Sequence, residues 1–155
     1  MANENKHTKR KTVLASGVFD LLHLGHVRFL EEAKKTGGPD AELIVIIARD
    51  STVLKRKGEK PVMPENQRCA LVDSLKVVDC AMLGFEGFDI REVIEKIRPA
   101  VIAVGYDQDG MENSVRQHVE KHSLQIRVVR IGKFGEDELN SSSKIKQRII
   151  EDFRR

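Results

Sequence analysis

The sequence predicts a single α/β domain with a Rossmann-like fold, in which about five parallel strands carry helices on both faces. At 155 residues the chain has the length of one ordinary domain. Its 40% hydrophobic and 33% charged residues are typical of a globular protein with one apolar core. Short apolar runs alternate with amphipathic stretches along the chain, and this alternation calls for right-handed crossovers between parallel strands.

The apolar runs are expected to be the strands. They are brief and rich in valine and isoleucine, as strands covered on both faces are. They span residues 12–16, 43–48, 81–83, 101–104 and 126–131. The preceding residues 1–11 are polar and charged, and we expect them to form a mobile tail on a domain that spans residues 12–155.

The amphipathic stretches are expected to be helices. They span residues 27–35, 65–76, 90–98, 111–122 and 144–153. Glycine and proline mark several of their ends. The first stretch ends at Gly37-Gly38, where a glycine can take the left-handed conformation that closes a helix. Pro64 suits the start of a first turn, and Pro99 cannot continue a helix.

Composition and charge exclude several classes of protein. No apolar run approaches the roughly 20 residues of a membrane span, and the polar first residues do not resemble a secretion signal, so we expect a cytoplasmic protein. The formal net charge of +3 is too small to indicate wholesale nucleic-acid binding. Cys69 and Cys80 form no C-x-x-C pair and are expected to be ordinary residues of a reducing compartment.

Metal sites are also not expected. His118 and His122 are four residues apart on a predicted helix and could share a face as zinc ligands, but no third ligand is evident. The segment from Asp107 to Gly110 looks like the start of a calcium loop. It fails that test, because the position where the loop needs a bidentate glutamate is His118.

A first candidate site follows the first predicted strand, at the sheet edge where open α/β sheets bind their ligands. His23 and His26 bracket a Leu-Gly pair where a helix begins, so their rings and the free N–H groups of the first turn can converge on one anion. An imidazole can donate a hydrogen bond to a phosphoryl oxygen and stabilise charge in a transition state. The alternative is that His23 packs on the sheet and His26 only opens the helix; the whole H-x-G-H pattern favours the phosphate site.

This segment resembles the H-x-G-H motif of the nucleotidylyltransferase superfamily. Gly-Val-Phe-Asp-Leu-Leu-His-Leu-Gly-His is particularly similar to its cytidylyltransferase branch, which includes glycerol-3-phosphate cytidylyltransferase and archaeal FAD synthase. Members join a phosphorylated acceptor to the α-phosphate of a nucleoside triphosphate and release pyrophosphate. The resemblance implies catalytic roles for both histidines and a nucleotide-binding segment made of Gly17, Val18, Phe19, Asp20, His23, Leu24, Gly25 and His26.

A second candidate site is a mobile basic loop over residues 55–60, followed by Arg68 on the next helix. It resembles the flexible lysines of the family that close over the triphosphate and the acceptor, with Lys57 and Lys60 as the favoured matches and Lys57 and Arg68 as catalytic residues. Lysine supplies a movable point charge and arginine a planar fork, which together suit a pyrophosphate leaving group. The alternative for Arg68 is a surface ion pair with Glu65 or Asp73.

Two further segments complete the resemblance. Helix capping explains one serine before the last helix but not three in a row. Ser141, Ser142 and Ser143 resemble the family's I-S-T/S-T/S-x-I motif, in which hydroxyls and amides meet the phosphates, and Ser142 is the expected catalytic member. Gly105 and Asp107 resemble a G-x-D motif near the nucleotide, where the aspartate would bind ribose or base or help hold a metal-bound triphosphate.

The resemblance implies an enzyme that uses ATP with a divalent cation, Mg²⁺, and transfers AMP to FMN to give FAD. The Leu-x-Ser-Ser approach to the last helix and the lack of an Arg-Thr-x-Gly run before it favour FMN as acceptor. The enzymatic alternative is a CTP-dependent transferase acting on glycerol 3-phosphate or a similar alcohol. The second alternative is a nucleotide-binding regulator without turnover. The resemblance also implies a homodimer, and neither a nucleic-acid nor a membrane partner is expected.

Overall fold

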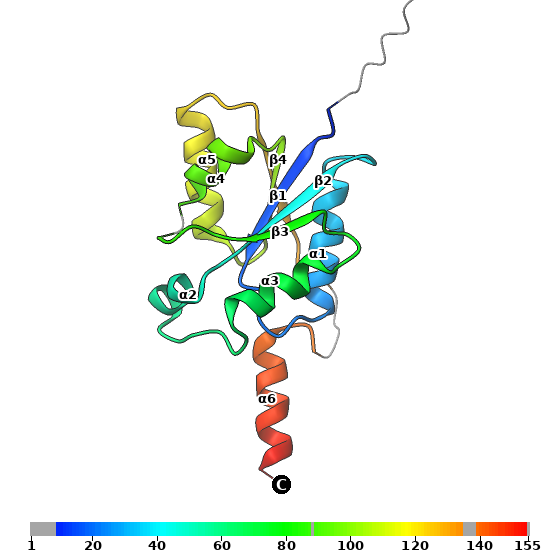
Figure 1. Cartoon of the computed structure of the whole chain (residues 1–155), viewed down its shortest axis with the longest axis vertical. Coiled ribbons are helices and arrows are strands. Elements are labelled where there is room, and N and C mark those ends of the chain that lie inside the picture. The colour runs from blue at the N-terminus through cyan, green and yellow to red at the C-terminus, as the bar shows by residue number, and fades with distance from the viewer. Residues whose placement is uncertain (1–8, 88, 135–138, 155) are drawn as a thin grey trace, which may run out of the picture.

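The protein forms one parallel sheet with helices on both faces (Figure 1). The computed structural model describes residues 9–87, 89–134 and 139–154; most of the tail predicted at 1–11 lies outside them. The strands are β1 (Thr12–Gly17), β2 (Glu42–Ile47), β3 (Cys80–Leu83), β4 (Val101–Gly105) and β5 (Arg127–Ile131). The helices are α1 (Leu24–Lys35), α2 (Asp50–Lys57), α3 (Glu65–Asp73), α4 (Ile90–Ile97), α5 (Asp109–Lys121) and α6 (Ser142–Phe153). The predicted fold class is confirmed.

The strand order is β3-β2-β1-β4-β5, with every neighbouring pair parallel. The chain builds one half of the sheet outward from β1 through β2 to β3, then returns to the other side of β1 with β4 and β5. The order therefore reverses between β1 and β4. Crevices for ligands form beyond the carboxyl ends of strands at such a point.

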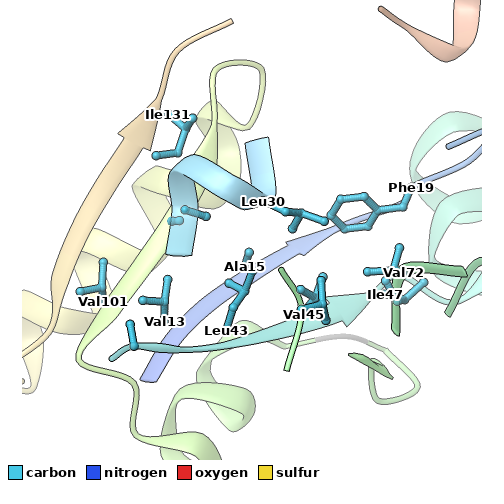
Figure 2. Packing of buried hydrophobic residues seen from close by; sticks show 14 residues of the cluster. Val13, Ala15, Phe19, Leu30, Leu43, Val45, Ile47, Val72, Val101 and Ile131 are labelled. Atoms are coloured by element: carbon cyan, nitrogen blue, oxygen red, sulfur yellow. The ribbon is translucent and has the colours of Figure 1, made fainter. Parts of the chain in front are cut away.

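The core has two layers because successive strand residues point to opposite faces. On one face Val13, Ala15 and Val45 pack with Leu30 of α1 and Val72 of α3 (Figure 2). On the other face the alternate strand residues pack against α4 and α5; these are Leu14, Ile46, Ile102 and Val104 with Val93, Ile94 and Val115. This two-sided burial explains the continuous apolar runs of the strands.

Helix α2 is the main departure from the sequence prediction. A basic loop is predicted at 55–60, but residues 55–57 form the last turn of α2, which ends at Gly58 with a φ of +78°. Only Val53 of this helix is buried, so its sequence carries no apolar periodicity. Its start is held by a distant partner: the Asp50 N–H donates to Glu65 Oε2 over 2.7 Å, and the Glu65 N–H donates to Asp50 Oδ2 over 3.3 Å. Such tertiary bonds are not visible in a local pattern.

Helix α6 has no buried residue and extends away from the sheet (Figure 1). Its first turn lies near the carboxyl end of β1, and the rest of the helix projects outward. Within the described residues, no helix is both long and apolar enough to cross a membrane.

Candidate active site

A cavity of about 620 Å³ opens beyond the carboxyl ends of β1 and β4. Its wall combines the residues that follow β1, one side of α2, the residues that follow β4 and β5, and the first turn of α6. These segments are far apart in sequence, and the reversal of strand order brings them together. The cavity therefore lies where the topology predicts a ligand.

The turn after β1 is held in an uncommon conformation. Phe19 and Leu21 have φ values of +53° and +48°, in the left-handed region that side chains other than glycine rarely adopt. Phe19 is only 4% exposed, and its ring centroid lies 5.3 Å from that of His26. A Cβ at Gly17 would lie 2.9 Å from the Phe19 ring, so the turn requires glycine there. Packing thus fixes the approach to the H-x-G-H residues.

The two histidines form one stacked unit at the start of α1. His23 is the N-cap residue and His26 lies in the first turn, with ring centroids 3.7 Å apart. The His23 backbone N–H donates to His26 Nδ1 over 3.3 Å. A neutral His26 ring must then carry its proton on Nε2, where it can donate to a ligand. His23 Nδ1 is buried and, as part of the side chain of the N-cap residue, faces the backbone N–H of His26 in a capping box.

Both rings favour the neutral form. Burial lowers the pKa of His23 below its usual value. Burial, and then repulsion by His23, lowers the pKa of His26 from its usual 6.5 to about 3, although Asp20 acts in the opposite direction. The site therefore presents two uncharged hydrogen-bonding rings at neutral pH. A bound polyphosphate would stabilise their protonated forms.

Helix α6 begins against the H-x-G-H segment. A Cβ at Gly25 would lie 3.0 Å from the Asn140 carbonyl oxygen, so the start of α1 approaches the chain before α6 closely. Ser141 caps α6 by accepting a hydrogen bond from the Lys144 N–H. The Ser142 hydroxyl donates to the Asp20 carbonyl oxygen over 2.5 Å. The helix N-terminus with its free N–H groups thus faces the cavity beside α1.

Asp20 bonds the turn after β1 to residues 62 and 63, which precede α3. Its Oδ2 accepts a hydrogen bond from the Val62 N–H over 2.8 Å, and its Oδ1 accepts one from the Met63 N–H over 2.9 Å. Asp20 lines the cavity, as predicted, but its carboxylate is engaged by the protein. Its position indicates that it holds the shape of the site.

Arg68 lies beneath the cavity and not in its wall. Its side chain is 0% exposed. Nε donates to Met63 O over 2.9 Å, and Nη1 donates to Val18 O over 2.5 Å. Nη2 donates to Ala48 O over 2.8 Å and pairs with Asp50 Oδ1 at 2.7 Å. These bonds engage Nε, Nη1 and Nη2 within the protein, where a phosphate contact was expected, and through them Arg68 joins three segments that frame the cavity. The alternative surface ion pair with Glu65 or Asp73 is not formed either.

The cationic side of the cavity is made by α2, the residues after it and α6. Lys57 and Lys60 line it as predicted, and Arg56 and Lys146 join them. Lys146 Nζ lies 3.8 Å from Glu59 Oε1, which links α6 to the residues after α2 across the cavity mouth. These exposed groups can follow a mobile phosphate at little cost.

The opposite side of the cavity is built by the residues after β4. The Gly105 N–H donates to Gln108 Oε1 over 2.7 Å, and Gln108 Nε2 donates to Ser16 O over 3.1 Å. Gln108 thereby ties the end of β4 to the end of β1. Asp107 is exposed and lines the cavity beside Gly105. This side offers a carboxylate and backbone edges, which suit a ribose or a base more than a phosphate.

Most predicted site residues meet at this cavity. Two do not line it, Leu24 and Arg68, although the N–H groups around Leu24 belong to the first turn of α1. The prediction missed several lining residues, among them Thr52, Arg56, Gln108, Met111, Lys133, Phe134 and Lys146. Arg56 adjoins Lys57, Gln108 adjoins Asp107, and Lys146 lies three residues after Ser143, so proximity in sequence could have indicated these three. The others carry no local signal.

Zinc ligation by His118 and His122 gains no support. Their ring centroids lie 4.6 Å apart, beside a second cavity of about 450 Å³ between α4 and α5. Within the described residues, no group of three or more His, Cys, Asp or Glu side chains could hold a metal ion.

Comparisons with known proteins place the chain in a family of nucleotide-using transferases by its sequence. The Cytidylyltransferase-like family matches residues 14–148. A protein of Thermoplasma volcanium named FAD synthase is 45% identical over 139 residues, which cover 90% of this chain and 94% of the relative. A protein of Ferroglobus placidus with the same name is 50% identical over 140 residues, which cover 90% and 88% of the two chains.

Solved structures give the same fold. A crystal structure from Thermoplasma volcanium, described as a lipopolysaccharide core biosynthesis protein, has a TM-score of 0.72 and 43% identity over 81% of this chain and 98% of that chain. Pantothenate synthetase from Thermus thermophilus shares the fold alone, with a TM-score of 0.59 and 17% identity over 86% and 60% of the chains. With the H-x-G-H pair at the reversal of strand order and a family match over most of its length, the chain belongs to the cytidylyltransferase-like family.

Proposed function

We propose that this protein is an FAD synthase, an FMN adenylyltransferase that transfers AMP from ATP to FMN and releases pyrophosphate. The observation that carries the proposal is the identity of 45–50% to FAD synthases of several organisms over about 90% of the chain. The stacked histidines at the head of a cavity with one cationic side support the same chemistry.

The reaction is an in-line displacement at the α-phosphorus of ATP. A phosphate oxygen of FMN forms the new P–O bond as the bond to the bridging oxygen of pyrophosphate breaks, and that oxygen leaves with the electron pair. The attacking phosphate is already ionised at neutral pH, so no general base is needed. Catalysis then rests on alignment and on stabilising the charge of the pentavalent centre.

The residues divide into roles by their place in the cavity. His26 Nε2–H and the N-terminal N–H groups of α1 and α6 donate to the triphosphate, where their partial positive charge favours an anion. His23 acts beside them, because its ring stacks on that of His26 and lines the cavity. Lys57 and Lys60 hold the departing pyrophosphate and the FMN phosphate. Gly105 lies on the side of the cavity that receives the nucleoside.

A divalent cation, Mg²⁺, belongs to the same proposal. The cavity carboxylates are Asp20, Glu59 and Asp107; the first is bonded to backbone N–H groups and the second pairs with Lys146. Among these three, Asp107 therefore fits Mg²⁺ best, since the ion commonly takes one or two carboxylates and binds mainly to substrate phosphates. When bound with ATP, the ion shields the triphosphate charge from the attacking phosphate.

Pyrophosphate release tests the proposal, measured with ATP or CTP against FMN or glycerol 3-phosphate in the presence of Mg²⁺. We expect release only with ATP and FMN, accompanied by FAD. Release only with CTP and glycerol 3-phosphate would support the cytidylyltransferase alternative, and tight ATP binding without release would support the regulator. Replacing His23 or His26 by alanine should lower turnover by about 10²- to 10³-fold; near-normal turnover would contradict the mechanism.

A homodimer, a cytoplasmic location and a domain that spans residues 12–155 also stay proposals.

A further inference from the structure

The cavity has an uncharged floor to which α2 and α5 both contribute. Ser16 of β1 and Ile46 of β2 are neighbours in register at the ends of their strands, and both line the cavity. Val53 of α2 and Met111 of α5 line it as well, and we call these four residues the floor. Ile46 and Val53 are only 2% and 4% exposed. Because no side chain of the floor carries a charge, it suits a neutral, largely apolar group better than a phosphate.

One polar atom beside this floor makes no bond within the protein. The hydroxyl oxygen of Thr52 is buried and has no hydrogen-bond partner among the described residues. Thr52 lies in the first turn of α2, directly before Val53, and lines the cavity. A buried hydroxyl without a partner costs free energy, and native proteins satisfy nearly all such groups. We therefore expect a ligand in the cavity to bond the Thr52 hydroxyl.

The side of α2 that lines the cavity changes from neutral to cationic along the helix. Thr52 and Val53 lie in its first turn, whereas Arg56 and Lys57 lie in its last turn and Lys60 follows the helix. Residues four apart lie on the same face of a helix. Thr52 and Arg56 are therefore on one face, about 6 Å apart along the helix axis. A ligand that lies along α2 meets a hydroxyl at one end and positive charge at the other.

FMN has the same division, with an uncharged ring system at one end and a phosphate at the other. The proposed function places its phosphate near Lys57 and Lys60, and the present inference rests on that function. The five-carbon ribityl chain between ring and phosphate has a reach comparable to one helical turn. The isoalloxazine ring carries C=O and N–H groups that can bond a hydroxyl. Its flat faces suit a methionine, whose sulfur makes favourable contacts with aromatic rings.

We propose that the floor and Thr52 form the flavin subsite, in which the isoalloxazine ring packs on the floor and its polar edge hydrogen-bonds to the Thr52 hydroxyl. The Ser16 hydroxyl donates to Met111 Sδ over 3.6 Å, which places the methionine at the end of β1 to receive the ring. Thr52 then contributes to the choice of acceptor. Glycerol 3-phosphate has no ring to place on the floor, and it would leave the buried hydroxyl without a partner.

Replacing Thr52 by valine tests the subsite, because valine keeps the shape of threonine and lacks its hydroxyl. Flavin fluorescence measures FMN binding in the presence of Mg²⁺ and α,β-methylene-ATP, which cannot transfer AMP. The Kd for FMN should rise about 10-fold in Thr52→Val, as expected for the loss of one hydrogen bond, and should stay near the wild-type value in Thr52→Ser. Ser51→Ala is the matched control, since Ser51 is the exposed neighbour on α2 and does not line the cavity; its Kd should not change.

Urea unfolding without ligands separates a contact with FMN from a structural role of Thr52. Because its hydroxyl bonds nothing within the described residues, Thr52→Val should not lower the free energy of unfolding. A lowered free energy of unfolding would mean that the hydroxyl bonds the protein, and would overturn the proposal.

Lumiflavin tests which part of FMN meets Thr52, because it has the ring system without the ribityl chain and the phosphate. As a competitor of FMN, its inhibition constant should rise about 10-fold in Thr52→Val. It should not change in Lys57→Met, whereas FMN binding should be weakened by both substitutions. An inhibition constant unaffected by Thr52→Val would place another part of FMN at the hydroxyl and overturn the proposal.

Failure of this inference can be told from failure of the proposed function. FAD formation by the wild type, with unchanged FMN binding in Thr52→Val, would overturn the flavin subsite alone. Weaker binding of α,β-methylene-ATP in that variant, with FMN binding unchanged, would place the adenosine on the floor and overturn the subsite as well. A wild type that neither binds FMN nor forms FAD would overturn the proposed function, and this inference with it.

Discussion

Replacing Arg68 by lysine separates a structural role of this residue from a phosphate-binding one. The substitution keeps the positive charge but loses the fork that donates to Val18, Ala48 and Met63 while it pairs with Asp50. A lysine reaching Asp50 leaves three carbonyl oxygens without their donor. Arg68 is fully buried, so water replaces those donors poorly.

The expected cost follows from these bonds. At about 1–1.5 kcal/mol for each of the three lost buried hydrogen bonds, Arg68→Lys should lower the free energy of unfolding by about 3–4.5 kcal/mol. That is a large share of the roughly 5–15 kcal/mol that stabilises a typical domain. Urea unfolding at pH 7 without substrate measures it. FAD formation should fall as well, because the turn bearing Val18 loses one of its anchors.

The matched control is Lys57→Met, which removes a charge from the wall of the cavity. Its unfolding free energy should stay within about 0.5 kcal/mol of the wild type, as for most surface changes, while its activity falls. The reasoning is refuted if Arg68→Lys unfolds like the wild type but has a KM for ATP raised more than about 10-fold, since that pattern indicates direct contact with the triphosphate.

Three further predictions concern the histidines and the turns around them. The unfolded chain gains a proton at His26 as the pH falls through 6.5, whereas in the folded protein His26 stays neutral until about pH 3. Between pH 6.5 and 4.5 the wild type should therefore lose about 2 kcal/mol more free energy of unfolding than His26→Asn, as measured by urea unfolding. Equal losses would contradict the neutral ring. A Cβ at residue 25 would lie 3.0 Å from both the Asn140 carbonyl oxygen and the His23 ring, so Gly25→Ala must displace one or both. Steady-state kinetics should then show a raised KM for ATP with little change in Tm; an unaltered KM would mean that Gly25 does not approach these groups closely. Ser142→Ala removes the bond to Asp20 and should cost about 1 kcal/mol in unfolding free energy; no loss would show that the bond is not formed in solution.

The sequence predicted those features of the fold and site that depend on local pattern. The strands were visible because β1, β2 and β4 are buried on both faces and therefore read as unbroken apolar runs. His23 and His26 were visible because their H-x-G-H pattern follows the first predicted strand at the point where a helix begins. The serines before α6 were visible because capping explains only one of them.

What the sequence did not predict depends on contacts between distant segments. Helix α2 has one buried residue and is held at its start by Glu65, so no periodicity indicated it. Arg68 resembled a ligand-binding arginine, but its neighbours in space are carbonyls from other segments. Gln108 joins β1 to β4 through a pairing that exists only once the sheet is assembled.

Transfer of a position-specific label tests the central claim most directly. With wild-type protein, FMN and Mg²⁺, phosphorus from [α-³²P]ATP should appear in FAD, and label from [γ-³²P]ATP should appear only in pyrophosphate. That result shows attack at the α-phosphorus and adenylyl transfer to the flavin. Label from the γ-position in a flavin product, or no labelled flavin at all while CTP and glycerol 3-phosphate react, would contradict the account.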